Sequence, residues 1–220
     1  MSSTSDATRP TYRPTIGIAG GIGGGKSAVA RLLAGLGCEV CISDEAARAV
    51  LDAPEVRAAI VARVGPSVTA PDGTIDRAAL GRAIFADPTV RADVERIMHP
   101  RIEARRRGQF AAAPVSTRAF VIDAPLLFEV GLDHECDAVI FVDAPRAFRL
   151  DRVRATRGWD DAELARREAS QLPLDEKRRR STDLVGNTGD PDALRLEVER
   201  VLGEIIRRGP RSGRHIPRHA

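Results

Sequence analysis

Short apolar runs alternate with longer amphipathic stretches along this 220-residue chain. The apolar runs are rich in Val, Ile and Ala, and a length of about five residues is typical of buried strands. We expect strands at 15–19, 38–42, 119–122 and 138–142, and a weaker strand at 184–185. Strands that alternate with helical stretches predict an α/β fold, in which helices flank a parallel sheet.

The chain between the second and third expected strands is much longer than a crossover requires. Residues 45–115 carry helical signals and no convincing strand, whereas a crossover between parallel strands needs roughly a dozen residues. We therefore expect a helical insertion there, which would bind a second substrate. Residues 145–180 form a second segment that departs from the alternation of strands and helices. In it, ten arginines and Lys177 follow an amphipathic helical pattern. Within the insertion, we expect His99 to cap a helix before Pro100 or to line the substrate domain.

The length and the termini limit the number of domains. A chain of 220 residues accommodates one α/β domain with an insertion. We expect its core at 15–44, 116–144 and 181–206, a disordered leader at 1–14 and a disordered tail at 207–220. The leader lacks the apolar stretch of a secretory signal, and no apolar run approaches the ~18 residues of a membrane span. These features predict a cytoplasmic protein that has no membrane partner.

The charge and the cysteines indicate no further partner. The formal net charge is +3 and the pI is near 9.1, but the tail holds five arginines and no acid. The remaining chain has 29 basic and 31 acidic residues, so we expect no nucleic-acid partner. Cys38, Cys41 and Cys136 are an odd number of cysteines. We expect them to lie in the core rather than to form a redox or zinc site.

A glycine-rich segment after the first expected strand carries the most specific chemistry so far. Gly20-(x4)-Gly25-Lys26-Ser27 matches the spacing of a phosphate-binding loop (P-loop) between a strand and a helix. Because glycine has no side chain, successive backbone N–H groups of the loop can surround phosphate oxygens. The helix N-terminus adds partial positive charge. Lys26 would reach the β- and γ-phosphates, and the Ser27 hydroxyl would ligate Mg²⁺. We expect ATP, with Mg²⁺, to contact Gly21, Ile22, Gly23, Gly24, Gly25, Lys26, Ser27 and Ala28.

Three aspartates follow expected strands, at the sheet edge where open α/β sheets bind ligands. They are Asp44, Asp123 and Asp143. Asp44 could orient and deprotonate an attacking hydroxyl or could cap the helix that follows, and the residues alone favour neither. Asp123 resembles the acid that binds the Mg²⁺ shell in many P-loop proteins, although a turn before Ala-Pro would also suit an aspartate.

Other segments, in their order along the chain, resemble those of dephospho-coenzyme A kinases. They are "SDEAARAVL", "GTIDRAALGRAIFADP", "IMHPRI", "DAPLLFEVGL", "CDAVIFVDAP", "RGWDDAELARREASQLPLDEKRRR" and "NTGD". The resemblance covers about residues 15–201. It implies transfer of the ATP γ-phosphate to the 3′-hydroxyl of dephospho-coenzyme A, giving coenzyme A. It also implies a nucleotide-binding core, a helical substrate domain at 45–115 and a helical, arginine-bearing lid at 145–180. We expect a monomer that acts on these two small molecules.

The resemblance also implies roles for single residues. It makes Asp44 the catalytic aspartate, whereas the family's preceding acid is Ile42 in this chain. Arg152 is the first candidate for the lid arginine at the transferring phosphate, because Thr156 stands where a second arginine is expected. Asn187 matches a late asparagine near the nucleotide base. Most other lid arginines we interpret as a solvated face.

Three other functions compete with this interpretation. A GTPase switch would have a glycine after the acid in "DAPLL" and a lysine at Thr188 in "NTGD", and this chain has neither. A kinase for another small-molecule acceptor, or a module that only binds ATP, is compatible with the P-loop motif. An assay of the acceptor separates these alternatives.

Overall fold

The structure is a computed structural model, and it describes residues 12–209. Most of the predicted leader and tail lies outside these residues. The chain divides into two compact units. The first contains the chain up to Cys41 and from Ala113 onward, and the second is Ile42–Ala112. No helix among the described residues is both long enough and apolar enough to cross a bilayer.

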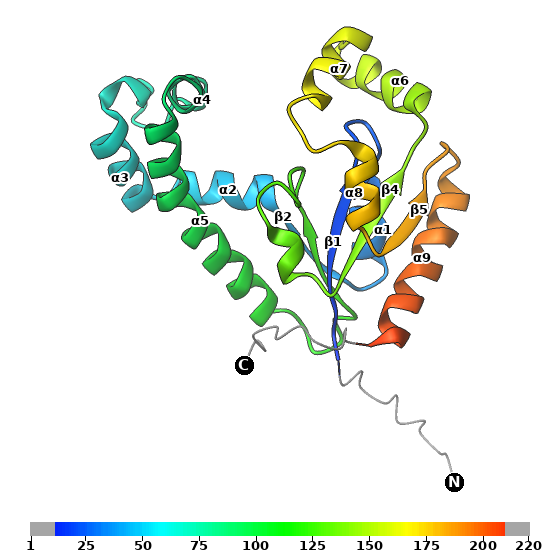
Figure 1. Cartoon of the computed structure of the whole chain (residues 1–220). Helices are drawn as coiled ribbons and strands as arrows, with labels where there is room; N and C mark the ends of the chain where they lie inside the picture. The colour runs from blue at the N-terminus through cyan, green and yellow to red at the C-terminus, as the bar shows by residue number, and fades with distance from the viewer. Residues whose placement is uncertain (1–11, 210–220) are drawn as a thin grey trace. The chain divides into compact units, whose positions relative to one another are not determined.

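The first unit contains a five-stranded sheet with the order β2-β3-β1-β4-β5 (Figure 1). Its strands are β1 (Thr15–Gly20), β2 (Glu39–Ile42), β3 (Phe120–Asp123), β4 (Ala138–Asp143) and β5 (Asp183–Gly186). β1 pairs in parallel with β3 and β4, and β4 pairs in parallel with β5. The predicted α/β fold is therefore confirmed, and each expected strand ends within one residue of its observed limits.

Helices cover both faces of this sheet. The helices of this unit are α1 (Lys26–Gly35), α6 (Arg146–Arg157), α7 (Asp161–Glu168), α8 (Leu174–Arg180), α9 (Pro191–Arg208) and the 3₁₀ helix η2 (Leu132–Glu135). Figure 1 draws α6 and α7 beyond the ends of the strands rather than on a face of the sheet. Ile16 and Ile18 of β1 belong to the core that α1 and α9 share, while α8 contacts β1 and β4 (Figure 1). On the face opposite Ile16 and Ile18, a Cβ atom at Gly17 would lie 2.7 Å from Leu127 Cδ2. Burial on both faces explains why the three central strands, β3, β1 and β4, are largely apolar.

The three cysteines lie in this first unit as predicted. Cys38, Cys41 and Cys136 are buried, and none of them forms a disulfide. Burial raises the pKa of Cys38 to about 11, so its thiol stays protonated and unreactive near neutral pH. The prediction of core cysteines is confirmed.

The second unit is helical and has its own core. Its elements are α2 (Ser43–Leu51), α3 (Pro54–Val64), the 3₁₀ helix η1 (Pro66–Val68), α4 (Arg77–Ala86) and α5 (Pro88–Ala111). α5 contacts each of the three other α-helices. The core between them includes Val56, Ile60 and Val94. The long helix α5 therefore organises the unit.

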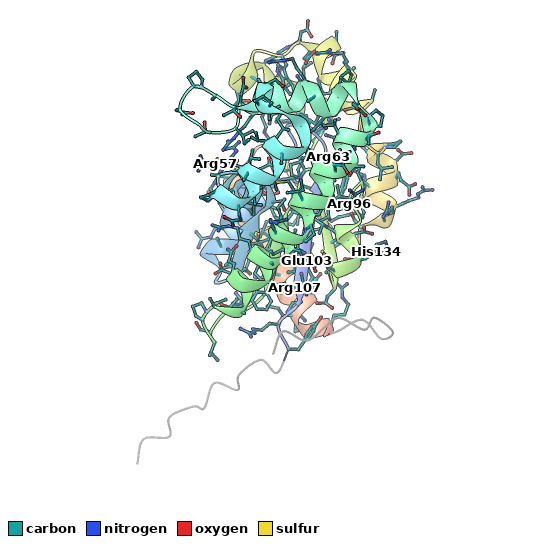
Figure 2. All side chains as sticks on the ribbon, turned by 90° about the vertical axis from the view of Figure 1, so that its left-hand side faces the viewer. Arg57, Arg63, Arg96, Glu103, Arg107 and His134 are labelled. Carbon is teal, nitrogen blue, oxygen red and sulfur yellow. The ribbon has the colours of Figure 1, made fainter. Side chains whose placement is uncertain are left out.

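A buried aspartate joins α3 to α5 in the second unit. Asp93 accepts hydrogen bonds from Arg63 and Arg96, whose side chains lie close together in Figure 2. These bonds hold the pKa of Asp93 below its ordinary value. Arg63 comes from α3, whereas Arg96 lies on α5 three residues after Asp93, so the Arg63–Asp93 pair links the two helices.

The prediction that a helix ends before Pro100 is wrong. Pro100 lies inside α5, and His99 is exposed in the middle of the same helix, so it caps nothing. A proline lacks the N–H that would bind the carbonyl of the fourth preceding residue. In the same turn the Arg101 guanidinium donates to the Ile97 carbonyl over 2.7 Å. Packing against three helices sustains α5 where the local rule predicts a break.

Candidate functional site

The loop between β1 and α1 adopts a conformation that requires glycine. Gly23 and Gly25 have φ angles of 74° and 94°, in the left-handed region that other residues rarely adopt. A Cβ atom on Gly23 would lie 2.5 Å from the Arg149 carbonyl oxygen. A Cβ atom on Gly25 would collide with the Asn187 amide. The glycines therefore serve both the backbone conformation and the close approach of neighbouring chain segments.

The N-terminus of α1 is open to an anion. Gly25 is the N-cap, no side chain caps the helix among the described residues, and its first turn contains no acidic residue. Uncapped N–H groups at a helix start, together with the helix dipole, attract phosphate oxygens. The loop and helix therefore have the features that a phosphate-binding site needs.

The Lys26 side chain folds back onto the glycine loop that precedes it in the sequence. Its Nζ donates to the carbonyl oxygens of Gly20 and Gly21, over 3.0 and 3.1 Å. Burial lowers the pKa of Lys26 to about 8, an effect that the nearby Asp123 carboxylate opposes and the Lys177 ammonium reinforces. A lysine held in this way can place its charge against a phosphate without first leaving bulk water.

Two oxygen ligands are suited to Mg²⁺ near this loop. Asp123 ends β3, is 7% exposed and acts electrostatically on Lys26, while Ser27 is exposed in the first turn of α1. The described residues contain no group of three or more His, Cys, Asp or Glu side chains that could hold a metal ion. Two protein oxygens fit Mg²⁺, which commonly keeps several waters and takes substrate phosphates as its other ligands. Asp143 instead pairs with Arg178, over 2.9 Å.

The structure brings the predicted lid arginine Arg152 to the loop. Its Nη1 donates to the carbonyl oxygens of Gly23 and Gly24, both over 3.2 Å, and its Nη2 donates to Asn187 Oδ1 over 2.8 Å. Asn187 is 3% exposed, and its amide group also donates to the Gly24 oxygen over 2.9 Å. Asn187 therefore supports the loop and orients Arg152. Its contact with a nucleotide base stays a prediction.

A second arginine of α6, Arg149, supports the loop, and the sequence-based prediction missed it. Arg149 is buried, donates to the Ala144 carbonyl over 3.2 Å and pairs with Glu168 of α7. A Cβ atom on Gly21 would lie 2.9 Å from Arg149 Nη1, so the guanidinium packs directly on the loop. The arginine-rich pattern of α6 could not separate this side chain from Arg154, which is 56% exposed.

Asp44 lies in the first turn of α2, in the second unit, but it does not cap this helix. α2 starts at Ser43, its N-cap is Ile42, and no side chain forms a cap hydrogen bond. The interpretation of Asp44 as an N-cap is therefore wrong, because the helix begins two residues earlier than that role requires. Its carboxylate is exposed in the first turn. The Asp44 carboxylate therefore takes no part in capping α2.

Comparison with known proteins assigns the chain to a family. The sequence model of the dephospho-CoA kinase family matches residues 14–192. The chain belongs to the dephospho-CoA kinase family. Curated dephospho-CoA kinases resemble it over almost their whole lengths. The protein from Deinococcus radiodurans is 39% identical over 206 residues, which are 93% of this chain and 99% of the relative. The one from Anaeromyxobacter dehalogenans is 42% identical over 205 residues, covering 92% and 95%.

Solved structures agree with this assignment. The Thermus thermophilus protein TT1252 matches with a TM-score of 0.76 and 33% identity, over 88% of this chain and 98% of that one. Dephospho-CoA kinase from Campylobacter jejuni matches with a TM-score of 0.65 and 25% identity, over 88% and 97%. The resemblance noted from motifs is confirmed, and the kinase fold extends over most of the chain.

Proposed function

We propose that this protein is an ATP-dependent kinase that phosphorylates the 3′-hydroxyl of dephospho-coenzyme A and releases coenzyme A. The family match over residues 14–192 carries this proposal. A glycine loop with an uncapped helix N-terminus and a buried lysine supports the ATP half of the reaction. Relatives of nearly the same length bear the name of this activity, which supports the acceptor half.

The loop and α1 would bind the triphosphate. Backbone N–H groups of residues 21–28 and the dipole of α1 would hold the phosphate oxygens. Lys26 would stabilise charge on the β- and γ-phosphates as the bond to the γ-phosphate breaks. Mg²⁺, held by Ser27 and Asp123, would neutralise phosphate charge when bound.

Asp44 and the lid would act on the transfer itself. Asp44 would accept the proton of the attacking 3′-hydroxyl, or orient that hydroxyl in line with the γ-phosphate. Arg152 would stabilise the charge of the transition state, and the lid would exclude water that could hydrolyse ATP. These roles use charge and position and need no covalent intermediate.

The experiment that tests the proposal is a direct assay of the acceptor. Purified protein is incubated with MgATP and dephospho-coenzyme A, and mass spectrometry follows the gain of one phosphate on the acceptor. Adenosine and 5′-AMP serve as competing acceptors, because each carries a ribose hydroxyl but no pantetheine arm. We expect coenzyme A as the product. Phosphorylation of another acceptor alone, or ADP formation without any phosphorylated acceptor, would contradict the proposal.

We also propose that the enzyme is a monomer that works in the cytoplasm without a nucleic-acid partner. The excess positive charge is confined to residues 207–220, and a charge run of this kind is commonly a solvated end. Light scattering during gel filtration tests the monomer, and gel-shift assays with DNA and RNA test the last point.

A further inference from the structure

A buried ion pair joins α8 to the segment that follows β3. Lys177 of α8 has a side chain that is 2% exposed, and its Nζ lies 2.8 Å from Glu129 Oε1. The same ammonium donates to Gln171 Oε1 over 2.9 Å. A lysine is almost never so deeply buried unless it is paired. The burial of Lys177 is therefore matched by two specific partners, Glu129 and Gln171.

Glu129 also holds the connection between α7 and α8, which is called the end of the lid below. Helix α8 falls within the predicted lid range of 145–180, but it contacts β1 and β4 of the sheet. Its Oε1 accepts a hydrogen bond from the Leu172 backbone N–H over 3.0 Å. Gln171 and Leu172 are the residues that lead from α7 back to α8. Burial disfavours the charged carboxylate, but the bonds from Lys177 and Leu172 outweigh burial and lower the pKa of Glu129. One ionised carboxylate thus connects the segment after β3, the end of the lid and α8.

The pair is also close to the P-loop lysine. Both Glu129 and Lys177 act electrostatically on Lys26, with opposite signs. Of the 34 lysines and arginines in the chain, only Lys26 and Lys177 are lysine. Lysine carries a compact ammonium, whereas the guanidinium of arginine is a larger planar group, and the two are not interchangeable at a buried site. This composition indicates that the geometry at Lys177 is demanding.

Stability alone does not explain a buried pair of this kind. Desolvation of two charges can exceed their attraction, and well-packed apolar residues often stabilise a fold as well or better. Moreover, Glu129 Oε2 is buried and makes no hydrogen bond to any described residue. A charged pair that holds backbone next to a phosphate loop instead suggests that the position of that backbone matters.

We propose that Glu129 and Lys177 are a positioning pair, which fixes the end of the lid and α8 relative to the P-loop for phosphoryl transfer. This proposal rests on the proposed kinase function. Neither residue needs to touch a substrate. When the pair is lost, the lid still exists but its end shifts, so water reaches the γ-phosphate more often and transfer slows.

The test compares single and paired substitutions with a matched control. Lys177→Met and Glu129→Leu each leave one buried group without its partner, whereas the double variant replaces the pair by apolar side chains. Arg180→Met is the control, because Arg180 also lies on α8 and also binds the segment after β3. It pairs with Asp133 over 2.9 Å and lies over the Phe128 ring at 4.6 Å from its centre. Melting temperature, kcat, KM for ATP, and ATP hydrolysed per acceptor phosphorylated are measured for each protein.

We expect the double variant to melt close to the wild type but to show a kcat lower by roughly 10- to 100-fold, as for a small misplacement of reacting groups. Its KM for ATP should change less than threefold, and more ATP should be hydrolysed per product. Arg180→Met should keep kcat within twofold at a temperature well below its melting point.

Two results would overturn the positioning role. One is a double variant with wild-type kcat and wild-type coupling of hydrolysis to transfer. The other is an Arg180→Met protein that loses as much kcat as Lys177→Met at matched stability, a comparison that also decides the question if the double variant folds poorly. Failure of the proposed function is a separate outcome, because then the wild type itself phosphorylates no dephospho-coenzyme A.

Discussion

At the scale of single residues, Lys26 gives the most direct test of the phosphate site. Its Nζ donates to the carbonyl oxygens of Gly20 and Gly21, which belong to the loop itself. We expect Lys26→Met to abolish transfer while the melting temperature without nucleotide changes little. Thermal unfolding and the acceptor assay check the two halves. Near-normal turnover in this variant would remove Lys26 from the phosphate site.

The lowered pKa of Lys26 also predicts a proton linkage. With a pKa of about 8, part of the free enzyme carries a neutral Lys26 near pH 8. A bound triphosphate favours the charged form and raises this pKa, so binding takes up a proton in that pH range. We expect uptake of up to roughly half a proton per ATP at pH 8, and less at pH 6. Calorimetry in buffers of different ionisation enthalpy measures the uptake, and equal uptake by Lys26→Met would contradict it.

Asp44→Asn separates charge from shape at the proposed base. Because Asp44 does not cap α2, its loss of charge should cost only the interaction with the helix dipole, roughly 0.3–1 kcal/mol. If Asp44 acts on the acceptor hydroxyl, turnover should fall by roughly 10²-fold or more while ATP affinity holds. Turnover close to that of the wild type would leave Asp123 as the next candidate. Nucleotide titration and steady-state kinetics provide both measurements.

The role of a single residue could be predicted where a sequence motif determines it. It could not be predicted where contacts with distant parts of the chain determine it. The spacing around Lys26 identified the phosphate loop because few other structures need that pattern of glycines. By contrast, nothing local distinguishes the buried Arg149 from the exposed Arg154 on the same helix. Their difference depends on Glu168, which lies on α7. Such partners become visible only when the chain has folded.

At the scale of elements, the lid helix α6 gives the loop an arginine with three acceptors. Arg152→Ala removes the bonds to Gly23, Gly24 and Asn187, so we expect a lower kcat and a higher KM for ATP. Arg152→Lys should not restore activity, because one compact ammonium cannot span the same acceptors. Arg154→Ala is the control on the same helix and should behave like the wild type. Equal, small effects of both alanine variants would mean that α6 presents only a solvated face.

Elements were predicted well where burial is uniform and poorly where packing overrides a local rule. The central strands β1, β3 and β4 follow from apolar runs, because a sheet covered on both faces buries their side chains. Pro100 misled the helix prediction because its cost is local, whereas the contacts that keep α5 intact come from α2, α3 and α4. An N-cap at Asp44 would misplace the start of α2 by two residues. Its N-cap is the apolar Ile42, which no capping rule would choose.

At the scale of the whole molecule, charge and fold occupy different parts of the chain. Helix α9 contributes Val198, Leu202 and Ile205 to the core of the first unit, and it ends at Arg208. The sequence beyond it holds three arginines and no acid. The positive net charge therefore belongs to the sequence beyond α9.

Two truncations test this separation. Deletion of residues 210–220 lowers the formal net charge from +3 to zero. We expect unchanged turnover and melting temperature, together with weaker retention on heparin, because non-specific binding of polyanions follows local positive charge. Deletion from Ile205 onward is the matched comparison, since it also removes a side chain that is 2% exposed and the ion pair of Arg208 with Asp183. That protein should lose roughly 2–5 kcal/mol of stability, as for other large losses from a core. If the shorter deletion instead slows transfer, the basic segment takes part in the reaction, and the kinase site extends beyond the fold described above.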